Sequence, residues 1–131
     1  MKPKKIFIVD DDKIFHFIVR KLIARQDPDT ELVFFENGLE AIERLRTKID
    51  SPELFPDVIL LDINMPVLDG WQFLDEFRTL KLRLGTVPRV YVVSSSDNEM
   101  DRDRARQYRE EVCDYYLKPM GHTEIEKIFL N

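Results

Sequence analysis

The chain has 131 residues, 44% of them apolar, and a formal net charge of −5. Its length and apolar fraction fit one domain with a substantial core and exclude a disordered acidic chain. Its negative charge disfavours a nucleic-acid binder, because such a protein needs a basic stripe. Its single cysteine, Cys113, excludes an internal disulfide and argues against a zinc cluster. The apolar run after the basic start "MKPKK" is four residues long, shorter than the roughly 7–15 residues of a signal peptide or the about 20 of a membrane span, so we expect a soluble, cytoplasmic protein that binds no membrane.

Short apolar runs alternate along the chain with amphipathic stretches of helix length. The expected strands are residues 6–9, 31–35, 57–61, 89–93 and 113–117. The expected helices are residues 13–26, the stretch from "ENG" through Leu45, the stretch from Gly70 through Leu80, and residues 98–110 and 122–130. The residues expected on the buried face of the first helix are Ile14, Phe17, Ile18, Leu22 and Ile23.

This alternation predicts the fold class. Uninterrupted Val, Ile and Leu runs are typical of strands that are covered on both faces. Strands that alternate with helices form parallel sheets through right-handed crossovers. We therefore expect one α/β domain over residues 1–131, a (βα)5 doubly wound sheet of five parallel strands. No regular element is expected between Pro52 and Pro56.

Polar residues that suit a binding site follow four of the five expected strands, whereas Glu36 after the strand 31–35 is the least distinctive. Ligands of doubly wound sheets bind beyond the carboxyl ends of the strands, so these residues are expected to share a pocket. They are Asp10, Asp11 and Asp12 after the first strand, Asp62 and Asn64 after the third, Ser94, Ser95 and Ser96 after the fourth, and Lys118 with Pro119 after the fifth.

Clustered carboxylates without neighbouring His or Cys ligands form an oxygen-only site of the kind that Mg²⁺ prefers. A divalent cation would offset the repulsion within the triple aspartate. A carboxylate is also a nucleophile toward phosphorus, and phosphoryl transfer depends mainly on positioning and charge stabilisation. A lysine and a serine hydroxyl would provide part of that stabilisation.

Four motifs carry a resemblance to a known family: "IVDDD", "LLDINMPVLDG", "VVSSS" and "YYLKP". In this order and at these intervals they resemble the receiver domain of two-component response regulators, of the stand-alone kind that is similar to chemotaxis regulators. The resemblance covers roughly residues 4–130. It implies a flavodoxin-like sheet with strand order 2-1-3-4-5. No output domain is expected in this chain beside the receiver domain.

The resemblance assigns roles in a metal and phosphoryl site. Asp62 would be the phosphoacceptor and would also bind the metal, Mg²⁺ or Mn²⁺. Asp11 would be a direct metal ligand, and Asp10 would act more often through water. Asn64 would offer its backbone carbonyl to the metal. No organic cofactor is implied.

A second group of residues would form the switch. Ser94 would be the switch hydroxyl, and Tyr115 the aromatic residue that moves with it. Lys118 would bind the phosphoryl group, and the Lys118–Pro119 peptide bond would be cis, a form that proline tolerates at low cost. The switched surface would comprise the fourth helix, the fifth strand and the fifth helix.

The implied function is signalling and not turnover of a substrate. The domain would catalyse its own phosphorylation from a sensor histidine kinase or a histidine phosphotransfer protein, and its own dephosphorylation. It would then act on a downstream protein target, without direct contact to nucleic acid. A homodimer through the surface of the fourth helix, fifth strand and fifth helix is a further expectation.

Simpler interpretations accompany several of these residues. The three aspartates are also favoured helix caps, and Asp12 is expected to be only a cap. Asp69 is expected to cap the third helix, with Gly70 providing backbone freedom. Tyr115 and Tyr116 alternate across a strand, so core packing is the alternative for either. His16 is expected to be exposed.

Other functions remain in competition. A Mg²⁺-dependent phosphohydrolase also uses an aspartyl phosphate, with its nucleophile in a "D-x-D" after the first strand. Here that strand ends in "DDD" without the Gly-Thr expected of such enzymes. A flavodoxin-type carrier would need a phosphate loop where this chain has three carboxylates. A pseudo-receiver would bind partners without phosphorylation, yet no acidic or lysine position is lost. The segment "QYREEVCDYY" departs from the small residues usual before the fifth strand, so the resemblance does not determine where the fourth helix ends and how the chain enters the fifth strand.

Overall fold

Five parallel strands form one sheet in the order β2-β1-β3-β4-β5 in a computed structural model that describes residues 2–130. The strands are β1 (Lys5–Val9), β2 (Glu31–Phe35), β3 (Val58–Leu61), β4 (Arg89–Ser94) and β5 (Val112–Leu117). The helices are α1 (Lys13–Gln26), α2 (Gly38–Thr47), α3 (Gly70–Leu80), α4 (Glu99–Arg106) and α5 (His122–Leu130). The predicted fold class and strand order are confirmed. The order reverses at β1, because the chain passes first to β2 on one side and then to β3 on the other.

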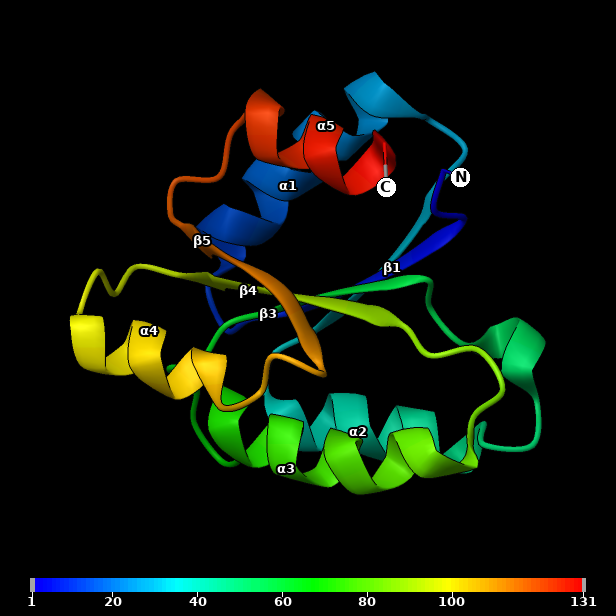
Figure 1. Cartoon of the computed structure of the whole chain (residues 1–131). Coiled ribbons are helices and arrows are strands. Elements are labelled where there is room, and N and C mark those ends of the chain that lie inside the picture. The colour runs from blue at the N-terminus through cyan, green and yellow to red at the C-terminus, as the bar shows by residue number, and fades with distance from the viewer. Residues whose placement is uncertain (1, 131) are drawn as a thin grey trace.

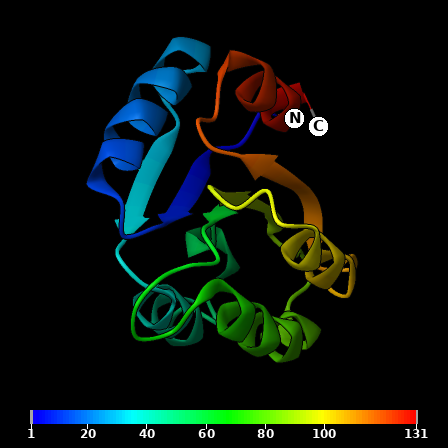
Figure 2. The ribbon, with the colours of Figure 1, turned by 90° about the vertical axis from the view of Figure 1, so that its left-hand side faces the viewer.

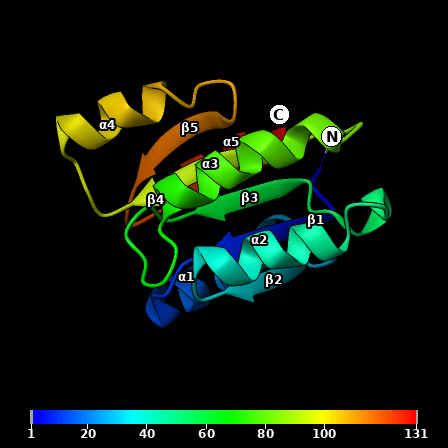
Figure 3. The same cartoon turned by 90° about the horizontal axis from the view of Figure 1, so that it is seen from below.

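The helices lie in two layers around this sheet. Figures 1 and 2 show α1 and α5 on one face and α2, α3 and α4 on the other, and in Figure 3 the strands point the same way. Successive strand residues face opposite layers. In β1, Ile6 and Ile8 pack with α1 and α5, whereas Phe7 and Val9 pack with α2 and α3. All four are buried, which is why the run is apolar throughout. No helix within residues 2–130 has the length and apolar character needed to cross a membrane.

The buried face predicted for α1 is confirmed at Ile23 but wrong at Ile14 and Phe17. Phe15, Val19 and Ile23 are the buried residues of this helix, whereas Ile14 is 73% exposed and Phe17 is 58% exposed. Apolar residues occur on both sides of this helix, so periodicity alone does not identify the face that meets the sheet. The consequence is an apolar patch on α1, Ile14 and Phe17, that faces solvent.

Two of the predicted segments also differ from the structure. The loop between Pro52 and Pro56 contains a short 3-10 helix over Pro52–Leu54, in which proline at the first position needs no N–H partner. The fourth helix was expected to reach residue 110 but ends at Arg106. Beyond it, hydrogen-bonded turns at residues 107–111 lead into β5, and Cys113 is an extra residue opposite the Val90–Tyr91 step of β4. This extra residue forms a β-bulge at the start of the fifth strand.

The buried Glu111 carboxylate explains how the turns after α4 are held. It forms ion pairs with Arg78, at 3.0 Å, and with Lys81. Burial raises its pKa, but the hydrogen bonds from Lys81 and Arg78 outweigh that effect and hold the pKa of Glu111 below its usual value. This carboxylate therefore ties the end of α3 to the start of β5.

The loop between β3 and α3 contains a strained turn at Val67. Its φ is 69°, and the Leu68 N–H donates to the Pro66 carbonyl at 2.8 Å, which closes a three-residue turn of the disfavoured hand. A β-branched side chain in this region is costly. Val67 is 74% exposed, so its side chain contributes little packing that would compensate.

We predict that Val67→Asn stabilises the protein by about 1 kcal/mol, because asparagine tolerates positive φ better than valine does. Chemical denaturation of the parent and the variant measures the difference. Val87→Asn is the matched control, since Val87 is also exposed and has no positive φ, and it should give no gain. An unchanged or lower free energy of unfolding for Val67→Asn would contradict the prediction.

Candidate functional site

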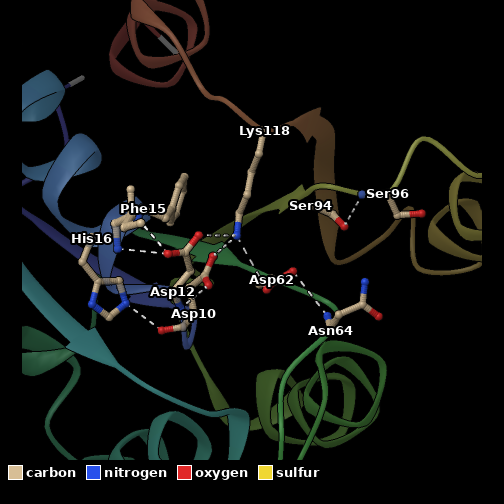
Figure 4. Close-up of polar contacts among 10 residues, drawn as sticks. Asp10, Asp12, Phe15, His16, Asp62, Asn64, Ser94, Ser96 and Lys118 are labelled. Atoms are coloured by element: carbon tan, nitrogen blue, oxygen red, sulfur yellow. Dashed lines mark hydrogen bonds and ion pairs between the residues drawn. The ribbon is translucent and has the colours of Figure 1, made fainter.

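The carboxyl ends of β1, β3, β4 and β5 place four predicted residues around one pocket. Figure 4 shows Asp10, Asp62, Ser94 and Lys118 converging there. The Asp10 residue is 1% exposed and Asp62 is 6% exposed, and Ser94 is fully buried. The meeting of these side chains, which the sequence predicted, is therefore present in the structure.

The tip of β1 directs its aspartates in different ways. The Asp10 N–H donates to the Phe35 carbonyl of β2 at 2.9 Å, and Asp10 Oδ1 accepts the Asp12 N–H at 2.9 Å. Asp12 is the N-cap of α1, and its Oδ1 accepts from the Ile14 and Phe15 N–H groups. The capping role predicted for Asp12 is confirmed. Asp11 lies between them and is exposed.

Lys118 neutralises part of this acidic pocket. Its ammonium lies 2.7 Å from Asp10 Oδ2, 3.7 Å from Asp62 Oδ2 and 4.0 Å from Asp12 Oδ2. It also lies 4.7 Å from the centroid of the Phe15 ring. Burial alone would lower the pKa of Lys118, but the neighbouring carboxylates raise it above its ordinary value. The predicted cis peptide bond between Lys118 and Pro119 is present.

The two buried carboxylates are strained electrostatically despite this cation. Burial is the main cause that raises the pKa of Asp10, and the hydrogen bond and charge of Lys118 oppose it. Burial, followed by the charge of Asp10, raises the pKa of Asp62 from 3.8 to about 6. One ammonium is therefore not enough to stabilise both charges in this pocket.

The β3–α3 loop holds Asp62 in place. The Asn64 N–H donates to Asp62 Oδ1 at 3.3 Å. The first residue of α3, Gly70, packs against the end of β3, where an added Cβ would lie 2.5 Å from the Asp62 carbonyl oxygen and 2.6 Å from Ile63 Cα. Gly70 does not have a positive φ, so the expectation of backbone freedom is wrong. Close approach of the two chain segments is what requires glycine here. Asp69 caps α3 as predicted, through a capping box with Gln72.

Ser96 connects the two predicted switch residues with α4. The Ser94 hydroxyl accepts the Ser96 N–H at 3.1 Å, and the Ser96 carbonyl accepts the Tyr115 hydroxyl at 2.7 Å. The Ser96 hydroxyl in turn donates to the Asp101 carboxylate of α4 at 2.6 Å. Tyr115 packs on the α2–α3–α4 side of the sheet and Tyr116 on the α1–α5 side, so their predicted alternation is confirmed.

The donor set at this pocket fits a hard divalent cation. One carboxylate oxygen from each of Asp10, Asp11 and Asp62 lies within 4.8 Å of the others. The buried Asp10 Oδ2 lies 2.7 Å from the Lys118 ammonium. Oxygen ligands and three carboxylates against one ammonium together match the preferences of Mg²⁺.

Comparison with known proteins decides the family. The sequence model of the response regulator receiver domain matches residues 6–129. The chain belongs to this receiver family. Receiver domains are signalling modules of two-component systems, so the resemblance found in the sequence motifs is confirmed.

This receiver is similar to proteins of several kinds. It is 31% identical to a phosphorylated cyanobacterial phytochrome response regulator, RcpA, with a TM-score of 0.77, over 98% of this chain and 94% of the other. It is 28% identical to the Mn²⁺-bound response regulator Rcp1, with a TM-score of 0.73, over 98% and 88%. A protein-glutamate methylesterase/protein-glutamine glutaminase of Methanospirillum hungatei is 32% identical over 95% of this chain. The receiver spans only 33% of that relative's length.

One polar residue of the receiver's site region was not predicted from the sequence. His16 was expected to be exposed, but it is half-buried, and its Nε2 lies 2.6 Å from the Asp10 carbonyl oxygen. The only sequence signal is its position, six residues after Asp10 and on the first turn of the following helix.

Proposed function

We propose that the domain accepts a phosphoryl group on Asp62 and that its surface then changes to favour a downstream protein. The arrangement that carries this proposal is a buried carboxylate with raised pKa, flanked by the Lys118 ammonium at 3.7 Å and by the Asp10–Asp11 carboxylates. The likeness to a response regulator described as phosphorylated supports it. All positions that the chemistry needs are present, which favours this function over a pseudo-receiver.

The metal site is part of the proposal. Asp11 and Asp62 would bind Mg²⁺ or Mn²⁺ directly, the Asn64 carbonyl would be a further ligand, and Asp10 would act through water. A bound cation would supply positive charge next to the oxygens of a transferring phosphoryl group. The crowded carboxylates and the likeness to a Mn²⁺-bound response regulator support this part.

Asp62 would be the nucleophile of the reaction, and Lys118 and Ser94 would bind oxygens of the transferred phosphoryl group. An Asp62 oxygen attacks phosphorus while the bond from phosphorus to the donor breaks, a P–N bond in a phosphohistidine, and the imidazole leaves with the electron pair. Lys118 is pre-positioned to bind a phosphoryl oxygen as its interaction with the Asp62 charge weakens. Ser94, at the end of β4, would donate its hydroxyl to another oxygen. A bound cation and the Lys118 ammonium would thus offset both the repulsion among the carboxylates and the negative charge of the phosphoryl oxygens.

The proposed response passes from Ser94 to the surface formed by α4, β5 and α5. Drawing the Ser94 hydroxyl toward phosphate would disturb its bond with the Ser96 N–H. Ser96 is hydrogen-bonded to Tyr115 and to Asp101 of α4, so a movement of Ser96 would alter the positions of both side chains. Phosphorylation then biases a two-state element, and the same surface is our proposed site of a homodimer.

The phosphoryl donor would be a sensor histidine kinase or a phosphotransfer protein. The apolar patch on α1, Ile14 and Phe17, lies next to the acidic pocket, because α1 starts directly after Asp12. Exposed large apolar side chains beside a site are typical of protein contact surfaces. We infer that the donor packs there.

We predict that Phe17→Asp lowers the rate of phosphotransfer from a phosphohistidine protein about tenfold or more but leaves phosphorylation by a small acyl phosphate unchanged. The control is Leu82→Asp, which alters another exposed apolar residue, beyond the end of α3 that is remote from Asp62. Equal loss with both donors would contradict a docking role for Phe17.

Mass spectrometry tests the proposed function directly. The protein is incubated with a small acyl phosphate and Mg²⁺, and in parallel with the acyl phosphate and EDTA. We expect one phosphoryl group per chain, formed only when Mg²⁺ is present. Borohydride reduction of the acyl phosphate should leave homoserine at position 62. Modification at another residue, or modification that forms when EDTA is present from the start, would contradict the proposal.

A further inference from the structure

His16 links three elements at the edge of the acidic pocket, and no step of the proposed function uses it. It lies on the first turn of α1 and is half-buried. Its Nε2 lies 2.6 Å from the carbonyl oxygen of Asp10, and Figure 4 shows the ring folded back toward that strand end. The ring also packs at a tilt on Phe34 of β2, with centroids 4.8 Å apart. The imidazole therefore touches α1, the tip of β1 and β2 together.

The Asp10 carbonyl needs such a partner. Val9 has the last β1 carbonyl that bonds to the neighbouring strand segment. It accepts the N–H of Asp62, directly after β3, at 2.9 Å. Asp10 follows it and is 1% exposed. Within residues 2–130, the hydrogen bond with His16 is the one that this carbonyl accepts. A buried carbonyl left without a partner is unfavourable, so the imidazole holds this peptide group in one orientation.

That peptide group leads directly to Asp11. Because a peptide unit is planar, fixing the Asp10 carbonyl also fixes where the Asp11 N and Cα lie. The Asp11 carboxylate is the exposed member of the three clustered carboxylates. In the described part of the chain it makes no hydrogen bond or ion pair of its own that would hold it. Its direction therefore depends on the backbone that precedes it.

We propose that His16 is a positioning residue for the divalent-cation site, acting through the Asp10 carbonyl on the direction of the Asp11 carboxylate. The inference rests on the proposed function, since it takes the cation as the ligand of this pocket. Partners that orient metal ligands from outside commonly change metal affinity about 10–100-fold when they are removed.

The bond itself can be observed without any substitution. A hydrogen bond to a carbonyl requires Nε2 to carry the proton. We expect ¹⁵N NMR of the histidine side chains to show a protonated Nε2 at His16 whose proton exchanges slowly with water. A neutral ring with its proton on Nδ1, or rapid exchange at Nε2, would overturn the proposal even if variants fail to fold.

Three variants measure the effect on the metal. Mg²⁺ titrations followed by NMR should show about tenfold weaker binding for His16→Ala than for the parent. His16→Gln, whose amide can donate from nearly the same position, should recover binding to within about threefold of the parent. His122→Ala is the control, because His122 is exposed at the start of α5, and it should bind as the parent does.

The outcomes separate the two proposals. Thermal unfolding in EDTA shows whether each variant is folded before the metal is added. If the parent binds Mg²⁺ and His16→Ala binds equally well, the positioning role is overturned and the proposed function stands. If His16→Gln binds as weakly as His16→Ala, a hydrogen bond is not what matters and the role is also overturned. If the parent binds no Mg²⁺, both proposals fail.

Discussion

Asp62→Asn is expected to abolish phosphorylation by a small acyl phosphate, with a rate at least about 10³-fold below that of the parent. The amide is a poor nucleophile toward phosphorus, and it carries no charge for the cation or for Lys118, which lies 3.7 Å from Asp62 Oδ2. Because the two side chains have nearly the same shape, the fold and the packing of β3 should be retained. Intact mass, measured over time at saturating Mg²⁺, gives the rate for each protein.

Asp69→Asn is the matched control for this experiment. Asp69 lies on the same β3–α3 connection and caps α3, and asparagine is an equally good cap. This variant should react within about twofold of the parent rate. Persistent phosphorylation of Asp62→Asn would place the acceptor on another residue, and equal loss in both variants would point to damage to the loop.

Asp62→Asn is also expected to stabilise the metal-free protein at high pH. Burial and the charge of Asp10 raise the pKa of Asp62 from 3.8 to about 6, which corresponds to up to about 3 kcal/mol of lost stability once the carboxylate is ionised. Asparagine carries no charge and avoids this penalty. In EDTA at pH 8, Asp62→Asn should therefore unfold at higher denaturant concentration than the parent.

The sign of the pH dependence follows from the direction of the shift. A carboxyl group whose pKa is higher in the folded state binds more protons when folded, between about pH 4 and pH 6. The free energy of unfolding of the parent therefore falls as pH rises through that window. The raised pKa of Asp10 acts in the same direction. At pH 4 the two proteins should differ little, and above pH 6 the difference should be complete.

Denaturant unfolding at pH 4 and pH 8 checks this prediction. Saturating Mg²⁺ should raise the stability of the parent at pH 8 by mass action and reduce the advantage of the variant. Asp69→Asn retains Asp62, so its stability should depend on pH and metal in the same way as that of the parent. A variant that is less stable than the parent at pH 8 would mean that the Asp62 charge is favourable in the metal-free fold.

Most of the fold could be predicted from local pattern. The strands β1, β3 and β4 are runs of mainly apolar residues that are buried on both faces. Each of the five strands is followed by a stretch of helix length, so that parallel strands and two helical layers follow from general rules. The site was predictable for a related reason. Strand ends are marked in the sequence by the change from apolar to polar residues, and carboxyl ends of parallel strands meet at one edge. Asp10, Asp62 and Lys118 are therefore neighbours in the structure.

Local pattern failed where two arrangements of the same residues satisfy it equally. Helix α1 has apolar residues on more than one side, and only packing against the sheet selected Phe15 over Phe17 as a buried residue. The turns that end α4 depend on Glu111, whose partners Arg78 and Lys81 lie far away in the sequence. A pairing of this kind leaves no periodic signal.

The sequence alone determined which chemical groups the pocket contains, because residue types and strand ends are both encoded locally. Tertiary structure decided how those groups are held. The contact between Gly70 and the end of β3 and the hydrogen bond between His16 and the Asp10 carbonyl each join segments whose closeness depends on the packing of helices against the sheet. Such distances result from the whole fold and not from the spacing of residues along the chain.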